Sequence, residues 1–282
     1  MPELPEVETI RRQLEQVLPG RVISAVEVLK AKSWSGDVKR VENQAVQSIS
    51  RRGKVLIMNL KSQDCLVIHL KMSGQLIFVD GDRRVGGGHP TDDWVSTLPS
   101  KHTRVVLHFT DGTHVYFNDQ RMFGWMRVMS EAEVHDALRK LAPDVIDAKI
   151  TVPYLLAAAQ KRRIPTKQFI MDNEVVAGVG NIYACDALNL AKISPTRPTN
   201  ALQEEEVVRL LAAMREVITL GIKKGGATVH GKYVHVTGLA GHYQEVLRVY
   251  NRSGESCPNC TGTIIKIRLG GRGTYYCPQC QK

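Results

Sequence analysis

The spacing of apolar residues near the start of the chain predicts a helix. Apolar side chains recur there at intervals of three and four, which places them on one helical face. Pro5 suits a first helical position, Glu6 and Glu8 fall in the first turn, and Pro19-Gly20 ends the run. The apolar positions are Val7, Ile10, Leu14, Val17 and Leu18.

From Arg21 to about Met129 the pattern changes to that of strands. Strand-like runs rich in apolar residues occupy 55–58, 66–70, 104–109 and 115–117, and Asp111-Gly112 has the composition of a hairpin turn. The glycine-rich stretch 81–90 predicts a loop without chemistry. The acidic segment 130–147 is typical of a helix followed by a linker.

After Pro153 the character is helical again, most clearly over 155–159 and 203–220. The second of these segments opens with three glutamates and carries Val207, Leu210, Met214 and Val217 on one face. Gly225 and Gly226 end it. At 282 residues the chain is long enough for two domains with a core in each.

Positive charge is concentrated toward the C-terminus. The chain carries a net charge of +10, and residues 221–282 hold nine Lys or Arg against Glu245 and Glu255. This excess favours a polyanionic partner, although a solubilising surface is the alternative. No secretory leader and no long apolar run are visible, so we expect a soluble, unexported, cytoplasmic protein; nothing demands an oligomer, so we expect a monomer.

Four of the six cysteines have the spacing C-x2-C-x16-C-x2-C, which predicts one structural Zn²⁺. Between the two pairs, 264–269 and 274–276 read as two short strands joined by a glycine-rich turn, with Arg272 near the tip. Four thiolates leave no open position for water, so the metal is structural rather than catalytic. The predicted ligands are Cys257, Cys260, Cys277 and Cys280.

Two further segments carry candidate chemistry, each with an ordinary structural alternative. Gly178 and Gly180 precede Asn181 before a helical run, which suits a phosphate site or a tight turn between helices. Removal of Met1 would expose the Pro2 amine beside Glu3, at the positive end of a helix that lowers the amine pKa and favours a neutral nucleophile. The alternative there is a plain helix cap.

Basic and bulky residues also follow strand positions. The turn 51–54 could bring Lys54 to a phosphate or a catalytic centre, or be a solvated charged turn. In 69–74 and 119–124, Met72, Arg121 and Phe123 could wedge into a base stack, with core packing as the alternative for Met72 and Phe123.

Together these segments resemble the formamidopyrimidine-DNA glycosylase family, bacterial enzymes that excise oxidised purines. The match runs from Pro2-Glu3-Leu4-Pro5-Glu6 through the 51–54 turn, 69–74, 119–124 and 178–184 to the cysteine hairpin. The resemblance implies an α+β fold. An N-terminal antiparallel β-sandwich flanked by helices (1–133) precedes a linker (134–152), a helix–two-turn–helix region (153–243) and a zinc β-hairpin (244–282).

The resemblance also implies roles. Pro2 is the nucleophile and Glu3 the general acid/base, with Lys54 and Arg272 completing the catalytic set. Lys54, His69, Asn181, Tyr250 and Arg272 match positions that grip phosphates around a flipped nucleotide, and Lys167 stands where the family usually has lysine. Met72, Arg121 and Phe123 match the intercalating set, with Arg121 facing the orphaned cytosine. The partner is double-stranded DNA with oxidised bases or abasic sites.

The implied reaction is excision through a Schiff base on Pro2, followed by β- and then δ-elimination. Two rivals remain: an endonuclease VIII type that prefers oxidised pyrimidines, and a zinc-hairpin protein that only binds damaged DNA. The chain departs from the family pattern at Asp186, where glutamate is common and we expect a looser contact. Met122, Asn251 and the segment 226–233 also depart from it.

Overall fold

The computed structural model describes residues 2–89, 97–228 and 241–282, and it divides into two compact units. Unit 1 comprises Met1–Arg139 and Lys224–His242; unit 2 comprises Lys140–Lys223 and Tyr243–Lys282. Among the described residues, no helix combines the length and the apolar character needed to cross a membrane.

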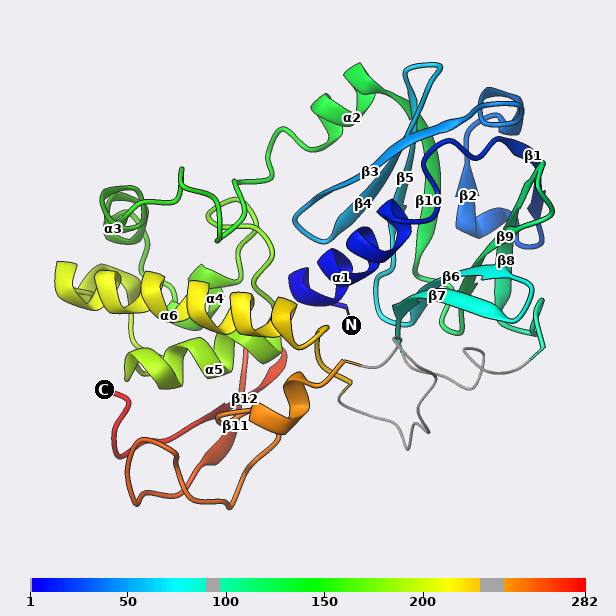
Figure 1. The fold of residues 1–282 in the computed structure, drawn as a ribbon. Helices are drawn as coiled ribbons and strands as arrows, with labels where there is room; N and C mark the ends of the chain where they lie inside the picture. The colour runs from blue at the N-terminus through cyan, green and yellow to red at the C-terminus, as the bar shows by residue number, and fades with distance from the viewer. Residues whose placement is uncertain (1, 90–96, 229–240) are drawn as a thin grey trace. The chain divides into compact units, whose positions relative to one another are not determined.

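Unit 1 is a β-sandwich of two five-stranded sheets with a helix packed against it (Figure 1). The first sheet has the order β1-β8-β9-β6-β7 and the second the order β2-β10-β5-β4-β3. Every pairing between these strands is antiparallel except the short β2–β10 pair. The strands are β1 (Ile23–Val28), β2 (Trp34–Ser35), β3 (Val46–Arg52), β4 (Val55–Leu60), β5 (Asp64–His69), β6 (Gly74–Asp80), β7 (Arg83–Gly88), β8 (Thr103–Phe109), β9 (His114–Asp119) and β10 (Trp125–Ser130).

Helix α1 (Leu4–Glu15) confirms the first predicted element. All five apolar positions of its face and of the following turn are buried in the core shared with the sheets. The helix contacts β3 and β7, and Figure 1 shows it beside both strands. Helix α2 (Glu131–Ala137) starts in the acidic segment, with Ser130 and Glu133 forming a capping box.

The prediction of a loop over 81–90 was wrong for most of its length, because Arg83–Gly88 forms β7. Gly86 and Gly88 lie at φ of +130° and +133°, and a Cβ on either would collide with backbone of β6. The glycines therefore allow β7 to lie close against β6. Composition alone does not distinguish glycines needed for close packing from glycines in a flexible loop.

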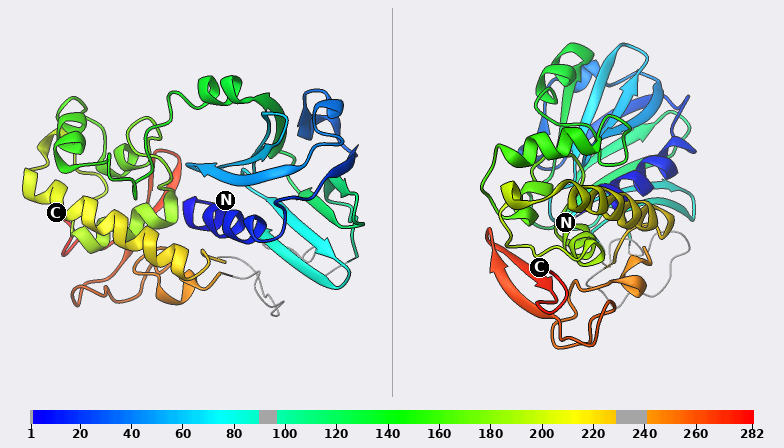
Figure 2. Two further views of the ribbon diagram at one scale, coloured as in Figure 1. Left: turned by 45° about the horizontal axis from the view of Figure 1, so that its top comes forward. Right: turned by 90° about the vertical axis from the view of Figure 1, so that its left-hand side faces the viewer.

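The described residues of unit 2 form four α-helices, two short 3-10 helices and a two-stranded hairpin. The elements are α3 (Val152–Gln160), α4 (Thr166–Ile170), α5 (Asn181–Ala191), α6 (Glu204–Lys223), β11 (Ile265–Leu269) and β12 (Arg272–Tyr276). Helix α6 packs along α5 and also contacts α3, and β12 packs on α5 (Figure 2). The four apolar positions predicted on α6 are all buried. The predicted hairpin is confirmed, with Gly270 and Gly271 at positive φ in its turn.

Candidate functional site

The N-terminal end of α1 holds the two residues with the strongest candidate chemistry. Pro2 and Glu3 are both buried, and Glu3 is the N-cap of the helix with extended backbone. Its N–H donates to Glu6 Oε2 at 2.7 Å, while Glu6 Oε1 accepts from the Ala227 N–H at 2.6 Å. Glu6 therefore ties the 225–228 segment to the start of the chain. The sequence indicated Glu6 only as a first-turn acid.

Gly226 explains why this segment can approach so closely. It has φ of +86°, and a Cβ there would lie 2.7 Å from the Glu6 side chain. Any other residue would be strained in backbone and would displace the carboxylate. Most of the segment 226–233, which departs from the family wording, lies outside the described residues.

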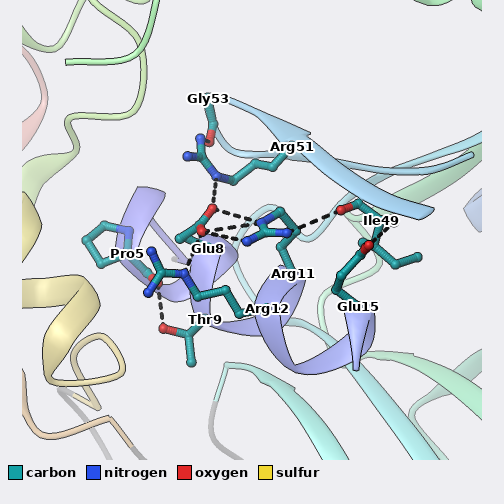
Figure 3. A network of polar contacts seen from close by, with 9 residues as sticks. All are labelled: Pro5, Glu8, Thr9, Arg11, Arg12, Glu15, Ile49, Arg51 and Gly53. Atoms are coloured by element: carbon teal, nitrogen blue, oxygen red, sulfur yellow. Dashed lines mark hydrogen bonds and ion pairs between the residues drawn. The ribbon is translucent and has the colours of Figure 1, made fainter. Parts of the chain in front are cut away.

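A buried carboxylate connects α1 to the basic turn between β3 and β4 (Figure 3). Glu8 accepts from the guanidinium groups of Arg11 at 3.0 Å, Arg12 at 2.7 Å and Arg51 at 2.9 Å. Burial pushes the pKa of Glu8 upward, but the hydrogen bonds from the three arginines outweigh it and lower that pKa from 4.5 to about 2. The carboxylate is therefore charged at neutral pH.

Arg51 also hydrogen-bonds to the turn between β3 and β4. Its side chain is only 6% exposed, and its Nη1 donates to the Gly53 carbonyl at 2.9 Å. Gly53 has φ of +57° and directly precedes Lys54. Hydrogen bonds from Arg51 to Glu8 and to Gly53 thus hold the backbone from which Lys54 extends. These contacts were not predicted from the sequence.

His69, at the end of β5, is a neutral imidazole at physiological pH. Burial lowers its pKa from 6.5 to about 4, and the charges of Lys71 and Lys54 contribute. The Lys71 N–H donates to His69 Nδ1 at 3.0 Å, so the ring proton resides on Nε2. A neutral Nε2–H donor beside lysine is suited to a phosphate oxygen. Lys54 is therefore close enough for its charge to lower the pKa of His69.

The three residues of the predicted wedge are exposed. Met72 is 38% exposed and Phe123 is 49% exposed, so the core-packing alternative was wrong. The Arg121 guanidinium lies 5.0 Å from the centre of the Phe123 ring. Large apolar side chains held at the surface next to a cation are what insertion into a base stack requires.

Asp119 and Ser73 hold the wedge residues in place. Asp119 is fully buried at the end of β9 and accepts from Ser73 Oγ at 2.5 Å and from the Gly124 N–H at 2.6 Å. Ser73 Oγ in turn accepts from the Arg121 N–H at 2.9 Å. The segments 69–74 and 119–124 are therefore both anchored to the Asp119 carboxylate. This function of Asp119 was not predicted from the sequence.

In unit 2 a buried lysine joins the glycine loop to the hairpin. Lys167 Nζ donates to Asn181 Oδ1 at 2.5 Å and to Thr274 Oγ1 at 2.6 Å. Asn181, the first residue of α5, donates from Nδ2 to the Gly273 carbonyl at 3.0 Å. Arg272 is exposed at the start of β12, directly before Gly273. These contacts join Lys167 and Asn181 to the strand that begins at Arg272.

Asp186 organises the segment that carries Tyr250. It is fully buried on α5 and accepts from the N–H groups of Arg248, Val249 and Tyr250 at 3.0–3.2 Å and from the Tyr243 hydroxyl at 3.1 Å. Burial raises the pKa of Asp186, and these donors oppose the rise. The expectation of a looser contact at Asp186 was wrong, because all of its hydrogen bonds have ordinary lengths.

Asn251 follows Tyr250 in a left-handed conformation at φ of +60°. Asparagine tolerates that region better than other non-glycine residues, which explains how it replaces the glycine common in the family.

The four cysteines fit a zinc ion. Their sulfur atoms all lie within 4.8 Å of one another, and the Cys257–Cys280 and Cys260–Cys277 sulfurs are 3.6 Å apart. Tetrahedral Zn–S bonds of about 2.3 Å require sulfurs about 3.8 Å apart, whereas a disulfide requires about 2.05 Å. The N–H groups of Asn259 and Gly262 donate to sulfur at 3.4 Å, as thiolates demand. The set matches one structural Zn²⁺.

Three family models match the chain in succession. The formamidopyrimidine-DNA glycosylase N-terminal domain matches residues 1–126, the H2TH domain of the same enzymes matches 141–232, and a zinc finger found in FPG and IleRS matches 254–282.

Relatives and solved structures agree with these models over the whole length. Proteins named formamidopyrimidine-DNA glycosylase from Desulforamulus reducens and Pelotomaculum thermopropionicum are 39% and 36% identical, covering 100% of this chain and 99% of each relative. A Lactococcus lactis FPG variant in complex with Fapy-dG-containing DNA matches at a TM-score of 0.88 and 31% identity, with 100% of both chains covered. MutM (FPG) from Thermus thermophilus matches at 0.85 and 33%, covering 99% of this chain and 98% of that one. The chain belongs to the formamidopyrimidine-DNA glycosylase family.

Proposed function

We propose that this chain is a bifunctional DNA glycosylase and abasic-site lyase that removes oxidised purines, with Pro2 as its nucleophile. The observation that carries the proposal is the burial of Pro2 and Glu3 together at the N-terminal end of α1. Once Met1 is removed, the Pro2 nitrogen is a secondary amine at the positive end of a helix. That field favours the neutral, nucleophilic amine.

The reaction proceeds by base displacement, sugar ring opening and two eliminations. The Pro2 nitrogen forms a bond to the sugar C1′ as the C1′–N bond to the base breaks, and the base leaves with a proton that Glu3 can supply. The nitrogen then loses its proton, the C1′–O4′ bond breaks with protonation of O4′, and an iminium forms between Pro2 and C1′. Loss of a C2′ proton then expels the 3′ phosphate by β-elimination, and δ-elimination expels the 5′ phosphate. The product is a one-nucleotide gap with phosphate ends.

The remaining residues hold the DNA for this step. Lys54 and His69 from unit 1, and Asn181, Tyr250 and Arg272 from unit 2, bind the phosphates that flank the flipped nucleotide, while the buried Lys167 positions Asn181 through its hydrogen bond. Met72, Arg121 and Phe123 enter the stack, which offsets part of the few kcal/mol that base flipping costs. The zinc site, when filled, rigidifies the hairpin that presents Arg272 and takes no part in the chemistry.

Substrate preference follows from the relatives. Their name specifies formamidopyrimidine DNA, and FPG of Lactococcus lactis was solved with Fapy-dG-containing DNA and with abasic-site DNA. We therefore expect excision of 8-oxoguanine and formamidopyrimidines ahead of thymine glycol. Because the substrate is DNA and the relatives are bacterial, we expect the enzyme to act in the cytoplasm. Faster excision of thymine glycol in parallel assays would favour the endonuclease VIII alternative.

Borohydride trapping on an 8-oxoguanine duplex tests the nucleophile. Reduction of the iminium should give a covalent protein–DNA adduct, and Pro2→Gly should reduce its yield at least tenfold because the constrained secondary amine is lost. Pro5→Gly makes the same change one helical turn on and should retain the adduct. Protein prepared with methionine aminopeptidase inhibited should form none, since its Pro2 nitrogen is part of a peptide bond. An undiminished adduct in these preparations, or none from the wild type, refutes the mechanism.

A further inference from the structure

A pocket of about 270 Å³ lies beside the wedge in unit 1, and Phe123 is the one wedge residue that lines it. One wall comes from Lys32 and the short strand β2, which carries Trp34. The other comes from residues 122–127, which include Phe123, Trp125 and Arg127. Two of the three tryptophans of the chain thus meet in one pocket, in a protein with only 6% aromatic residues. Two tryptophans in one pocket exceed what the low aromatic content of the chain leads us to expect.

The pocket is built on a rigid floor. β2 pairs with β10 in the register Met126–Trp34 and Arg127–Ser35, and Met126 between the two walls is fully buried. The Trp34 indole Nε1 donates to the Gly36 carbonyl at 2.8 Å. Gly36 itself has φ of +104°, and a Cβ there would lie 2.8 Å from Val128 Cβ. A glycine is therefore required to seat β2 against β10, and the indole orientation is fixed by a hydrogen bond.

The charge around the pocket has one sign. Of its nine lining residues, Lys32 and Arg127 are cations and none is an acid. The Arg127 guanidinium stacks 4.2 Å from the centre of the Trp125 ring, which holds a positive group at the wall. A purely apolar occupant such as a hydrophobic peptide would offer no negative charge to Lys32 and Arg127. Ring faces combined with cations are the elements that bind a nucleobase together with its phosphate.

We propose that this pocket binds a nucleotide of the DNA strand opposite the lesion, with the base stacked on Trp34 or Phe123 and its phosphate near Lys32 and Arg127. The choice of strand rests on the proposed function and on the family resemblance, which implies that Arg121 faces the orphaned cytosine. The pocket-lining run starts at the next residue, Met122, so the same loop that fills the gap leads into the pocket. Binding here would hold the undamaged strand while the other is distorted.

Two substitutions test the pocket on duplex DNA that carries an uncleavable abasic analogue opposite cytosine, in which binding does not depend on Pro2. Trp34→Ala should weaken affinity about tenfold because it removes a stacking face, without changing the salt dependence. Lys32→Ala, at an exposed position, should weaken affinity about threefold and lower the slope of log affinity against log salt by about one phosphate contact. Lys39→Ala removes an exposed cation that does not line the pocket and should do neither.

Strand assignment uses 2-aminopurine placed in turn next to the lesion on each strand. We expect a fluorescence change on wild-type binding for the opposite strand, lost in Trp34→Ala and retained in Trp34→Phe. Wild-type affinity in both Trp34→Ala and Lys32→Ala, or a probe response confined to the damaged strand, overturns the proposal. If Trp34→Ala does not fold, Lys32→Ala and the probe still decide it. Absence of the borohydride adduct would instead refute the proposed chemistry and leave these binding results intact.

Discussion

The two units hold their candidate DNA-contacting residues by different physical means. In unit 1 the 51–54 turn and the wedge are anchored by Glu8 and Asp119, carboxylates that accept hydrogen bonds from side chains and backbone. In unit 2 the hairpin is closed by four thiolates that match a metal site. The first arrangement depends on buried carboxylates, and the second depends on a metal. The two can therefore be disrupted separately.

Unit 2 also contains a carboxylate anchor, which refines this contrast. Asp186 fixes residues 248–250, whereas the cysteines fix the ends of the hairpin strands. The hairpin core joins both parts, since Cys257, Cys277, Val249 and Tyr275 pack in one small cluster. Such a cluster is too small to hold a hairpin without a metal. We therefore expect unit 2 to be the more sensitive of the two to loss of a single anchor.

Zinc removal should give the largest effect. Structural zinc contributes on the order of 10 kcal/mol to small domains, so a chelator or Cys277→Ala should disorder the hairpin and lower affinity for lesion DNA at least a hundredfold. All three tryptophans, at positions 34, 94 and 125, belong to the unit 1 part of the sequence. Their fluorescence should stay native while DNA binding is lost. A simultaneous unfolding signal from tryptophan would contradict independent anchoring, and restored binding after zinc addition is the control.

Asp186→Ala should come next, with a loss of about 4 kcal/mol in the free energy of unfolding of unit 2. The substitution leaves several buried N–H donors and the Tyr243 hydroxyl without their acceptor, and each such donor costs about 1–3 kcal/mol. Asp186→Glu keeps the carboxylate and adds one methylene, so it should lose only about 1–2 kcal/mol. Urea unfolding measures both. Equal losses in the two variants would show that shape, not hydrogen bonding, dominates at this site.

Glu8→Gln should reduce the free energy of unfolding of unit 1 by about 2–3 kcal/mol at pH 7. Lowering the pKa of Glu8 from 4.5 to about 2 corresponds to roughly 3.4 kcal/mol, and solvent screening reduces that value. Because the folded pKa lies below the unfolded value of 4.5, this stabilisation is complete above pH of about 5 and is lost as the pH falls toward 2. The difference between wild type and Glu8→Gln should shrink over that window in urea unfolding series. Arg12→Ala, whose side chain is 58% exposed, should cost under about 1 kcal/mol. A difference that is constant with pH would exclude the ionised carboxylate as its source.

Local patterns in the sequence predicted the elements that depend on neighbours along the chain. The apolar period predicted α1 and α6, and the cysteine spacing predicted the metal site. Each of these signals spans a few residues, so backbone geometry alone makes it readable.

The anchoring roles of Glu8, Asp119 and Asp186 were not predicted, because their partners are distant in sequence. Glu8 meets Arg51 across 43 positions, Ser73 meets Asp119 across 46, and Asp186 meets Val249 across 63. The antiparallel β6–β9 register pairs Gly74 with Asp119 and so brings Ser73 to the carboxylate. No spacing rule encodes such a pairing, which depends on which strands become neighbours. Strand β7 was missed for another reason, because its partner β6 is adjacent in sequence but its glycines have the composition of a loop.

Ser73→Ala should give the smallest effect and the most selective one. The hydroxyl donates to Asp119 and accepts from the Arg121 N–H, so its loss should cost about 1 kcal/mol of stability and loosen the Arg121 loop. Discrimination between cytosine and adenine opposite the lesion should fall severalfold in single-turnover excision, with zinc content unchanged. Ser48→Ala, on β3, removes a hydroxyl that meets Asn59 and should leave discrimination intact. Unaltered opposite-base preference in Ser73→Ala would mean that Asp119 alone positions the wedge, since its bond to the Gly124 N–H survives the change.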